Sequence, residues 1–259
     1  MSTISAFAYE TYYLGLRTMR RFLRVPSNWI SIIFFPLTQL LVFSQLYQDI
    51  TQLAGFGGQS NYLAYLAPGQ IAFAAFLAVN WAAVGMLVEY RGGYLDKLRA
   101  SPIGRWSILA GEMVPLFFQA AMMAGALLFV SLLFGASLVT GLGGFLLILA
   151  LSGAFGIAFA GASFIPALLT RSEQTSSSLS MLTFPLAFIS TAFVPEALLP
   201  EWIRVFNRWN PVSYLIEAIR ALMVTGYDWG AIGAALLSMA ILGVILQVIT
   251  LWAFHRLAR

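Results

Sequence analysis

Long apolar runs without charged side chains dominate this chain, and their lengths predict membrane-spanning helices. The charge-free runs cover residues 25–48, 50–88, 113–170, 174–195 and 229–254. A helix crosses a bilayer core of about 30 Å with about 20 residues, so the third run is long enough for two crossings. Its glycine-bearing segment GASLVTGLGG supplies a turn between them. The pattern predicts six spans, at residues 29–48, 62–88, 113–134, 143–168, 176–194 and 229–254.

Basic residues gather at one end of the six predicted spans. Eleven arginine and lysine residues lie in the N-terminal segment, in the connections at 89–112 and 169–175, and at the C-terminus. Three others, Arg204, Arg208 and Arg220, lie on the opposite side. Because arginine and lysine are enriched on the cytoplasmic side of membrane proteins, we expect both termini in the cytoplasm. The chain is then a multi-pass protein of the cell (inner or plasma) membrane.

Residues 4–24 are too polar to cross a membrane but have the periodicity of an amphipathic helix. At 100° per residue, four arginines share one face, opposite apolar side chains such as Tyr12 and Phe22. The four are Arg17, Arg20, Arg21 and Arg24. We predict a helix in the cytoplasmic interface, with its arginines toward lipid headgroups or a partner. This N-terminal unit, residues 1–28, precedes one membrane domain of residues 29–259; a frayed tail is the alternative.

The segment between the fifth and sixth spans, residues 194–226, is apolar but interrupted by prolines. Its two helical stretches, 200–209 and 211–224, would be about 15 Å and about 21 Å long, too short to cross. Asn210 suits the N-cap of the second stretch, and Pro211 its first position. The first stretch has one aromatic face, formed by Trp202, Val205, Phe206 and Trp209. We predict two short helices that dip into the outer half of the membrane. A flat hairpin on the surface is the alternative.

Composition excludes several classes of function. Hydrophobic residues make up 60% of the chain and charged residues 9%, unlike soluble domains or nucleic-acid-binding proteins with basic surfaces. Cysteine is absent and His255 is the single histidine, so we expect no metal site and no cysteine or histidine catalysis. The single lysine, Lys97, lies between Asp96 and Leu98 and forms no P-loop. We therefore expect a chain that is not itself an enzyme and carries no cofactor.

Charged residues are concentrated in the connection between the second and third spans, which has the sequence EYRGGYLDKLRASPIG at residues 89–104. After the glycine pair, Tyr94, Leu95 and Leu98 can share the apolar face of a helix of two turns, while the charged side chains face elsewhere. By composition alone, a solvated loop is the simpler interpretation. A connection that only joins two spans needs neither this length nor an amphipathic helix, so the pattern also suggests a docking surface.

This stretch resembles the cytoplasmic signature of type-2 ATP-binding-cassette (ABC) exporter permeases, E-x-x-x-G-x-L-[DE]-[RK]-L-x-x-x-P. The matching residues are Glu89, Gly93, Leu95, Asp96, Lys97, Leu98 and Pro102. Residues 184–223 also resemble the fifth span and outer re-entrant helices of that family, above all in LP-x-W and NP-x-x-Y. The segment YLAPGQIAFAAF is similar to the second span of the daunorubicin-resistance branch. Tyr94 and Lys97 depart from the usual small residue and arginine, which bears on the choice of partner.

The resemblance implies the transmembrane permease subunit of an ATP-driven exporter. Its coupling helix, which docks on a separate ATPase subunit, would use Glu89, Arg91, Gly93, Tyr94, Leu95, Asp96, Lys97, Leu98, Arg99 and Pro102. Two ATPase copies, with ATP and Mg²⁺ bound in them, would drive two permease copies, either a homodimer or a pair with a related permease. The implied cargo is amphipathic or hydrophobic: a drug, an antibiotic, a lipid or a lipid-linked glycan.

By the same resemblance, the two short outer helices cap the pathway as an external gate. The implied gate residues are Trp202, Phe206, Trp209, Asn210, Pro211, Tyr214, Glu217 and Arg220. Glu217 and Arg220 are three positions apart on a helix and can form an ion pair. Such a pair serves either gating or structure alone, and the sequence leaves both open.

Four polar side chains within the spans are candidates for the substrate path, because lipid cannot satisfy them. They are Gln39, Gln45, Asn80 and Gln119, with interhelical hydrogen bonds as the alternative role. Phe184 and Phe188 are candidates for an apolar lining, or for ordinary packing. The alternative function is an ATP-independent secondary carrier or channel, but such proteins commonly have ionisable groups at mid-span, and these spans have none there. A membrane-embedded hydrolase lacks clustered catalytic residues, and a scaffold role stays open.

Overall fold

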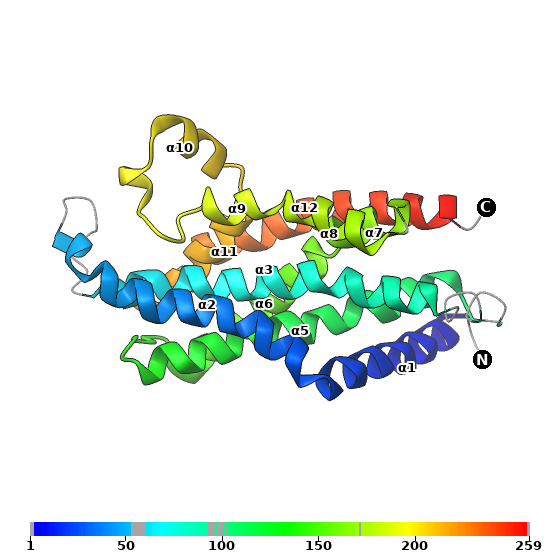
Figure 1. The fold of residues 1–259 in the computed structure, drawn as a ribbon. Helices are drawn as coiled ribbons and strands as arrows, with labels where there is room; N and C mark the ends of the chain where they lie inside the picture. The colour runs from blue at the N-terminus through cyan, green and yellow to red at the C-terminus, as the bar shows by residue number, and fades with distance from the viewer. Residues whose placement is uncertain are drawn as a thin grey trace.

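The computed structural model describes residues 3–52, 61–92, 97, 101, 103–170 and 172–257, whose regular structure is helical throughout (Figure 1). The long helices are α1 (Thr3–Arg24), α2 (Pro26–Leu46), α3 (Tyr62–Arg91), α5 (Arg105–Leu133), α6 (Gly141–Phe159) and α12 (Trp229–Leu257). The short ones are η1 (Gln48–Gln52), α7 (Gly161–Thr170), α8 (Glu173–Met181), α9 (Phe184–Phe188), η2 (Glu196–Leu198), α10 (Glu201–Asn207), α11 (Pro211–Arg220) and the π-helical turn η3 (Ala221–Thr225). The prediction of an all-α protein is confirmed for the described residues.

Five segments of the described chain are long and apolar enough to cross a membrane: Trp29–Leu46, Tyr62–Asn80, Trp106–Leu133, Gly141–Thr170 and Trp229–Phe254. They coincide with five of the six predicted spans. The remaining predicted span, residues 176–194, falls on α8 and α9. These two helices are separated by a turn at Leu182 and Thr183. Pro185 in the first turn of α9 has no backbone N–H to continue the hydrogen bonding of α8. This part of the chain is therefore two short helices rather than one continuous span.

Both chain termini lie at one end of the helical bundle (Figure 1). We call this the terminal end; the last turn of α3 and the start of α5 also lie there. The opposite end, which we call the far end, contains η1, the start of α3 and the connection between α5 and α6. Helix α10 stands off to one side of the bundle near the far end (Figure 1).

Helix α3 is the centre of the bundle. From Tyr62 to Asn80, 94% of its residues are buried, and it packs against α2, α5, α6, α7, α8 and α11. Glycine allows the closest approach: a Cβ at Gly69 would lie 2.6 Å from the carbonyl oxygen of Ala192. Similarly, a Cβ at Gly156 in α6 would lie 2.8 Å from the carbonyl oxygen of Leu116 in α5. This packing lets one rigid helix contact polar clusters at both ends of the molecule.

Candidate functional site: two polar clusters joined by one helix

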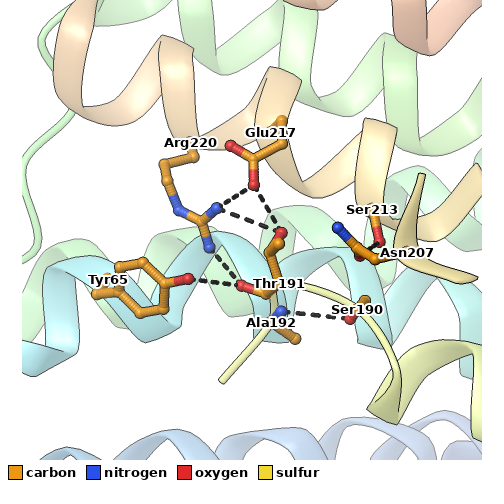
Figure 2. Close-up of polar contacts among 8 residues, drawn as sticks. All are labelled: Tyr65, Ser190, Thr191, Ala192, Asn207, Ser213, Glu217 and Arg220. Atoms are coloured by element: carbon orange, nitrogen blue, oxygen red, sulfur yellow. Dashed lines mark hydrogen bonds and ion pairs between the residues drawn. The ribbon is translucent and has the colours of Figure 1, made fainter. Parts of the chain in front are cut away.

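Irregular backbone interrupts the helical bundle after α9, at residues 190–194. Ser190, Thr191 and Ala192 are all buried in this segment. In a membrane-embedded protein such backbone is tolerated only where protein or water satisfies its polar groups. The partners come from what we call the far-end cluster, which consists of Tyr65, Thr191, Glu217 and Arg220 (Figure 2).

The far-end cluster is held by short hydrogen bonds centred on Thr191. Arg220 Nη2 donates to the Thr191 carbonyl oxygen at 2.7 Å, and the Tyr65 hydroxyl donates to the same oxygen at 2.9 Å. Glu217 Oε1 accepts from Thr191 Oγ1 and from Arg220 Nη1, both at 2.6 Å. The Arg220 guanidinium carbon lies 4.2 Å from the centroid of the Tyr65 ring, within cation–π range. Helices α3 and α11 are thus both fastened to one peptide group.

Local sequence explains why α11 presents Glu217 and Arg220 side by side. The predicted cap is confirmed: Asn210 Oδ1 accepts from the backbone N–H of Val212 at 3.0 Å, and Pro211 occupies the first turn. One face of α11 is apolar and buried, through Val212, Leu215, Ile216 and Ile219. The two charged residues are one turn apart on another face, where Thr191 lies (Figure 2). The helix ends at Arg220, and its predicted continuation to residue 224 is a π-helical turn.

The structure separates the eight predicted gate residues into two groups. Asn210, Pro211, Tyr214, Glu217 and Arg220 belong to α11 or its cap, and α11 packs between α3 and α12. The Tyr214 hydroxyl donates to the carbonyl oxygen of Arg208 at 2.7 Å. In contrast, Trp202, Phe206 and Trp209 belong to α10 or follow it, and they are 61%, 63% and 85% exposed. Helix α11 is therefore packed into the bundle, whereas the aromatic side chains of α10 are exposed.

The predicted path residues do not form one site. The Asn80 side chain donates to the carbonyl oxygen of Phe76 and accepts from Thr183 Oγ1 at 3.2 Å, which is the interhelical bond considered as its alternative. Phe184 packs edge to face on Phe76, and Phe188 is half exposed and stacks on Phe193. The three glutamines are scattered: Gln119 is buried in α5, Gln45 is exposed, and Gln39 Oε1 is buried without a partner.

A second polar cluster fastens α1 to the terminal end of the bundle. This terminal-end cluster consists of Glu10, Thr18 and Arg21 in α1 and Glu112 in α5. Thr18 Oγ1 donates to Glu112 Oε1 at 3.0 Å, while Arg21 Nη2 lies 3.9 Å from Glu112 Oε2. Arg21 Nη1 donates to the carbonyl oxygen of Gly85 in α3 at 3.4 Å, and Glu10 Oε2 accepts from the N–H of Gly104 at 3.1 Å. Helix α1 therefore contacts both α3 and α5.

The four arginines assigned to the membrane interface have different surroundings. Arg20 and Arg24 are exposed, whereas Arg17 and Arg21 are partly buried. Arg21 lies against α3 and α5 rather than on the outer surface of α1. Part of that outer surface is aromatic, because Tyr9, Tyr12 and Tyr13 are exposed.

Most of the predicted coupling residues lie outside the described residues. These are Gly93, Tyr94, Leu95, Asp96, Leu98, Arg99 and Pro102, together with the side chains of Glu89 and Arg91. Lys97 is described as helical and exposed. The described backbone on either side, at Gly85 and Gly104, is bonded to α1. Helix α1 is thus bonded both to α3 and to the residue that precedes α5.

Comparison with known proteins identifies the family. Residues 9–224 match the family described as ABC-2 type transporter. The chain belongs to this family. A relative from Cyanophora paradoxa, named as the transport permease ycf38, is 29% identical over 237 residues, covering 85% of this chain and 77% of that protein. The daunorubicin resistance ABC transporter permease protein DrrB1 of Streptomyces coeruleorubidus is 25% identical over 210 residues, covering 80% and 72%. The predicted identity as a type-2 ABC permease is confirmed.

Sequence reasoning missed several residues that hold the two clusters of this permease together. Thr191 and Tyr65 carry no charge, and their bond joins positions 126 residues apart. A signal for Thr191 was present in the run of Ser190 and Thr191 inside a predicted span, where hydroxyls need partners. Glu112 had a signal too, because it is an acidic residue next to the third span and α1 is rich in arginine.

Proposed function

We propose that this permease is the membrane subunit of an ATP-driven exporter and that it receives work through residues 89–104 from a separate ATPase subunit. The observation that carries the proposal is the attachment of α1 to both sides of this connection, through Gly85 on the α3 side and through Gly104 and Glu112 on the α5 side. A force applied to the connection is then shared by α1, α3 and α5. ATP and Mg²⁺ are bound by the ATPase, two copies of which act on two permeases.

Helix α3 transmits the motion to the far end. Gly85 and Tyr65 are twenty residues apart on it, which is about 30 Å at 1.5 Å per residue. Tyr65 bonds the carbonyl group of Thr191, and Gly69 packs against Ala192, so a shift of α3 moves residues 190–194. In this proposal the far-end cluster, with Asn210, Pro211 and Tyr214, is the gate that opens when α3 and α11 part.

Cargo passes along the face formed by α8 and α9. Support comes from α8, where Gln174, Thr175, Ser177 and Ser178 are exposed within an otherwise apolar protein. Lipid leaves such groups unsatisfied, so water, cargo or the second permease faces them. The half-exposed Phe188 in α9 adds an apolar surface beside them. We infer an amphipathic small molecule as cargo, as the name of the daunorubicin resistance relative suggests.

The test uses vesicles that contain the permease together with a candidate P-loop ATPase subunit of the ABC class. Inside-out vesicles of a cell membrane should accumulate daunorubicin, followed by its own fluorescence, when ATP and Mg²⁺ are added. The double variant Leu95→Asp/Leu98→Asp should insert normally and lose this uptake, because charge on the apolar face prevents docking. The matched control is Gln48→Asp/Gln52→Asp, which places the same charges on exposed positions at the far end and should transport normally.

Three other outcomes distinguish the proposed ATP-driven exporter from its alternatives. Full ATP-dependent uptake by the Leu95→Asp/Leu98→Asp variant contradicts coupling through residues 89–104. Uptake that needs neither the ATPase nor nucleotide supports a secondary carrier or channel. ATPase stimulation by other compounds, without daunorubicin uptake, keeps the coupling and replaces the cargo class.

A further inference from the structure

The turn that ends α11 is wound more widely than an α-helix. In the π-helical turn η3, the N–H of Gly226 donates to the carbonyl oxygen of Ala221, five residues earlier, at 2.8 Å. In an α-helix the same N–H would donate to the carbonyl oxygen of Leu222, four residues earlier. Turns of this kind are rare and are frequent at functional sites, so the contacts that favour this one are informative.

The connection between α5 and α6 supplies those contacts. Thr140 Oγ1 donates to the carbonyl oxygen of Leu222 at 2.7 Å, and the N–H of Val139 donates to that of Met223 at 3.1 Å. In an α-helix, N–H groups four residues further along the chain would bond these two oxygens. The connection therefore occupies the acceptors that α-helical winding would use.

The start of α6 places Thr140 for this role. Thr140 is the N-cap residue of α6, where a threonine hydroxyl usually accepts from the first turn of its own helix. Its hydroxyl makes no such bond and is directed to Leu222 instead. Glycine makes the room, because a Cβ at Gly144 would overlap Thr140 Oγ1. The Tyr227 hydroxyl completes the contact by donating to the Thr140 carbonyl oxygen at 3.3 Å.

The winding of η3 sets the direction of Arg220, the last residue of α11. On the other side of η3 the chain is also held, since Gly226 has a φ of +120° and Asp228 Oδ1 accepts two N–H groups from the first turn of α12. Each residue of a helix turns through about 100°. Rewinding the turn by one residue would therefore rotate Arg220 by about that angle relative to α12 and take its guanidinium away from Thr191.

We propose that Thr140 is a positioning residue for the gate: its hydroxyl, with the N–H of Val139, holds η3 in its wide form, and this winding keeps Arg220 bonded to Thr191. When Thr140 releases Leu222, the turn rewinds as an α-helix and α11 separates from residues 190–194. The inference rests on the proposed function only in naming α11 as part of the gate.

Helix α5 gives this contact a route to the terminal end. It begins at Arg105, directly after residues 89–104, and ends at Leu133, seven residues before Thr140. Its 29 residues span about 42 Å at 1.5 Å per residue. A displacement of the connection at 89–104 thus reaches the end of α11 along α5, as well as the Thr191 peptide group along α3.

The test compares the cost of losing Arg220 with and without the Thr140 hydroxyl. Thr140→Val keeps the shape of the side chain and removes the donor, and Arg220→Met removes the guanidinium. Denaturant unfolding in detergent micelles measures the unmodified chain, both single variants and the double variant. Arg220→Met should raise the unfolding equilibrium constant at least about tenfold less in the Thr140→Val background, because the guanidinium has already left Thr191 there.

Two threonine variants serve as controls. Thr38→Val removes a hydroxyl that donates to the carbonyl oxygen of Phe34 at 2.8 Å in α2, and it should leave the effect of Arg220→Met unchanged. Thr140→Ser keeps the donor at its position and should restore the full effect of Arg220→Met.

Gly144→Ala reaches the same contact from the side of α6. Alanine forms helices better than glycine, so this change would by itself favour α6. Its Cβ displaces Thr140 Oγ1 from Leu222, and Arg220→Met should again cost less in this background. If Thr140→Val does not fold, the comparison with Gly144→Ala decides the question.

Equal effects of Arg220→Met in the unmodified chain and in the Thr140→Val background would overturn the proposal, because Thr140 would then only stabilise its own connection. An equally reduced effect in the Thr38→Val or Thr140→Ser background would also overturn it, since the Thr140 hydroxyl would not be the cause. None of these measurements needs an ATPase or cargo. Failure of daunorubicin uptake therefore counts against the proposed function alone, and additive unfolding against the role of Thr140 alone.

Discussion

The far-end and terminal-end clusters both attach neighbouring segments to α3, but they differ in how tightly they do so. At the far end, Arg220 is only 12% exposed and its bonds to Glu217 and to the Thr191 carbonyl are 2.6 and 2.7 Å long. At the terminal end, Arg21 is 35% exposed and contacts Glu112 and Gly85 at 3.9 and 3.4 Å. The acidic partners differ in the opposite sense, since Glu217 is 47% and Glu112 9% exposed, so the contrast lies in the contact distances. The arginine at the far end is thus bonded more closely to its partners than the arginine at the terminal end.

The largest expected effect is that of Arg220→Met. It removes the charge-assisted hydrogen bonds that Arg220 donates to Thr191 and Glu217, so we expect the free energy of unfolding to fall by about 3 kcal/mol. Denaturant unfolding in detergent micelles measures this. Arg204→Met, which removes a bond to the carbonyl oxygen of Leu199, is the matched control and should cost less. Equal losses in the two variants would remove the distinction that we draw for the far-end cluster.

Helix α3 has one glycine near each cluster, and the two glycines differ in the atoms that an added Cβ would contact. A Cβ at Gly69 meets the backbone of Ala192 at 2.6 Å, whereas a Cβ at Gly85 meets the end of the flexible Arg21 side chain at 2.9 Å. We expect Gly69→Ala to destabilise the permease by about 2 kcal/mol, because backbone cannot move aside. Gly85→Ala should change stability by less than about 0.5 kcal/mol. Thermal unfolding of the two variants side by side measures both; the reverse order contradicts the comparison.

The smallest expected effect is the coupling between Arg21 and Glu112. A double-mutant cycle with Arg21→Met and Glu112→Gln should give a coupling energy of about 1 kcal/mol or less, because the charged atoms are 3.9 Å apart and Arg21 is 35% exposed. The same cycle with Thr191→Val and Arg220→Met should give a larger value. A larger coupling energy for Arg21 and Glu112 than for Thr191 and Arg220 would contradict the comparison between the two clusters.

Local features of this protein were predictable because they depend on neighbouring residues. The Asn210 cap, the start of α11 at Pro211 and five of the spans follow from periodicity, hydropathy and backbone chemistry. The break between α8 and α9 was also encoded, in Pro185 and the hydroxyl-rich sequence of α8, but a count of charge-free residues does not detect it. The spacing of Glu217 and Arg220 predicted their ion pair, which is present at 2.6 Å.

The partners of these features were not predictable in the same way. Nothing near Glu217 in the sequence indicates that Tyr65, far away on α3, binds the same peptide group through Thr191. Likewise, the arginine face of α1 was apparent, yet the turn of Arg21 toward Glu112 depends on α5 packing against that helix. Such contacts depend on which helices become neighbours.

By itself, the sequence determined the helical class, the apolar spans, the absence of a P-loop and the family, because each is written in composition or in short motifs. The tertiary structure decided that the aromatic face of α10 points outward and that α3 links two polar clusters. The reason is physical: periodicity defines the faces of a helix, but only packing against distant segments decides what each face meets.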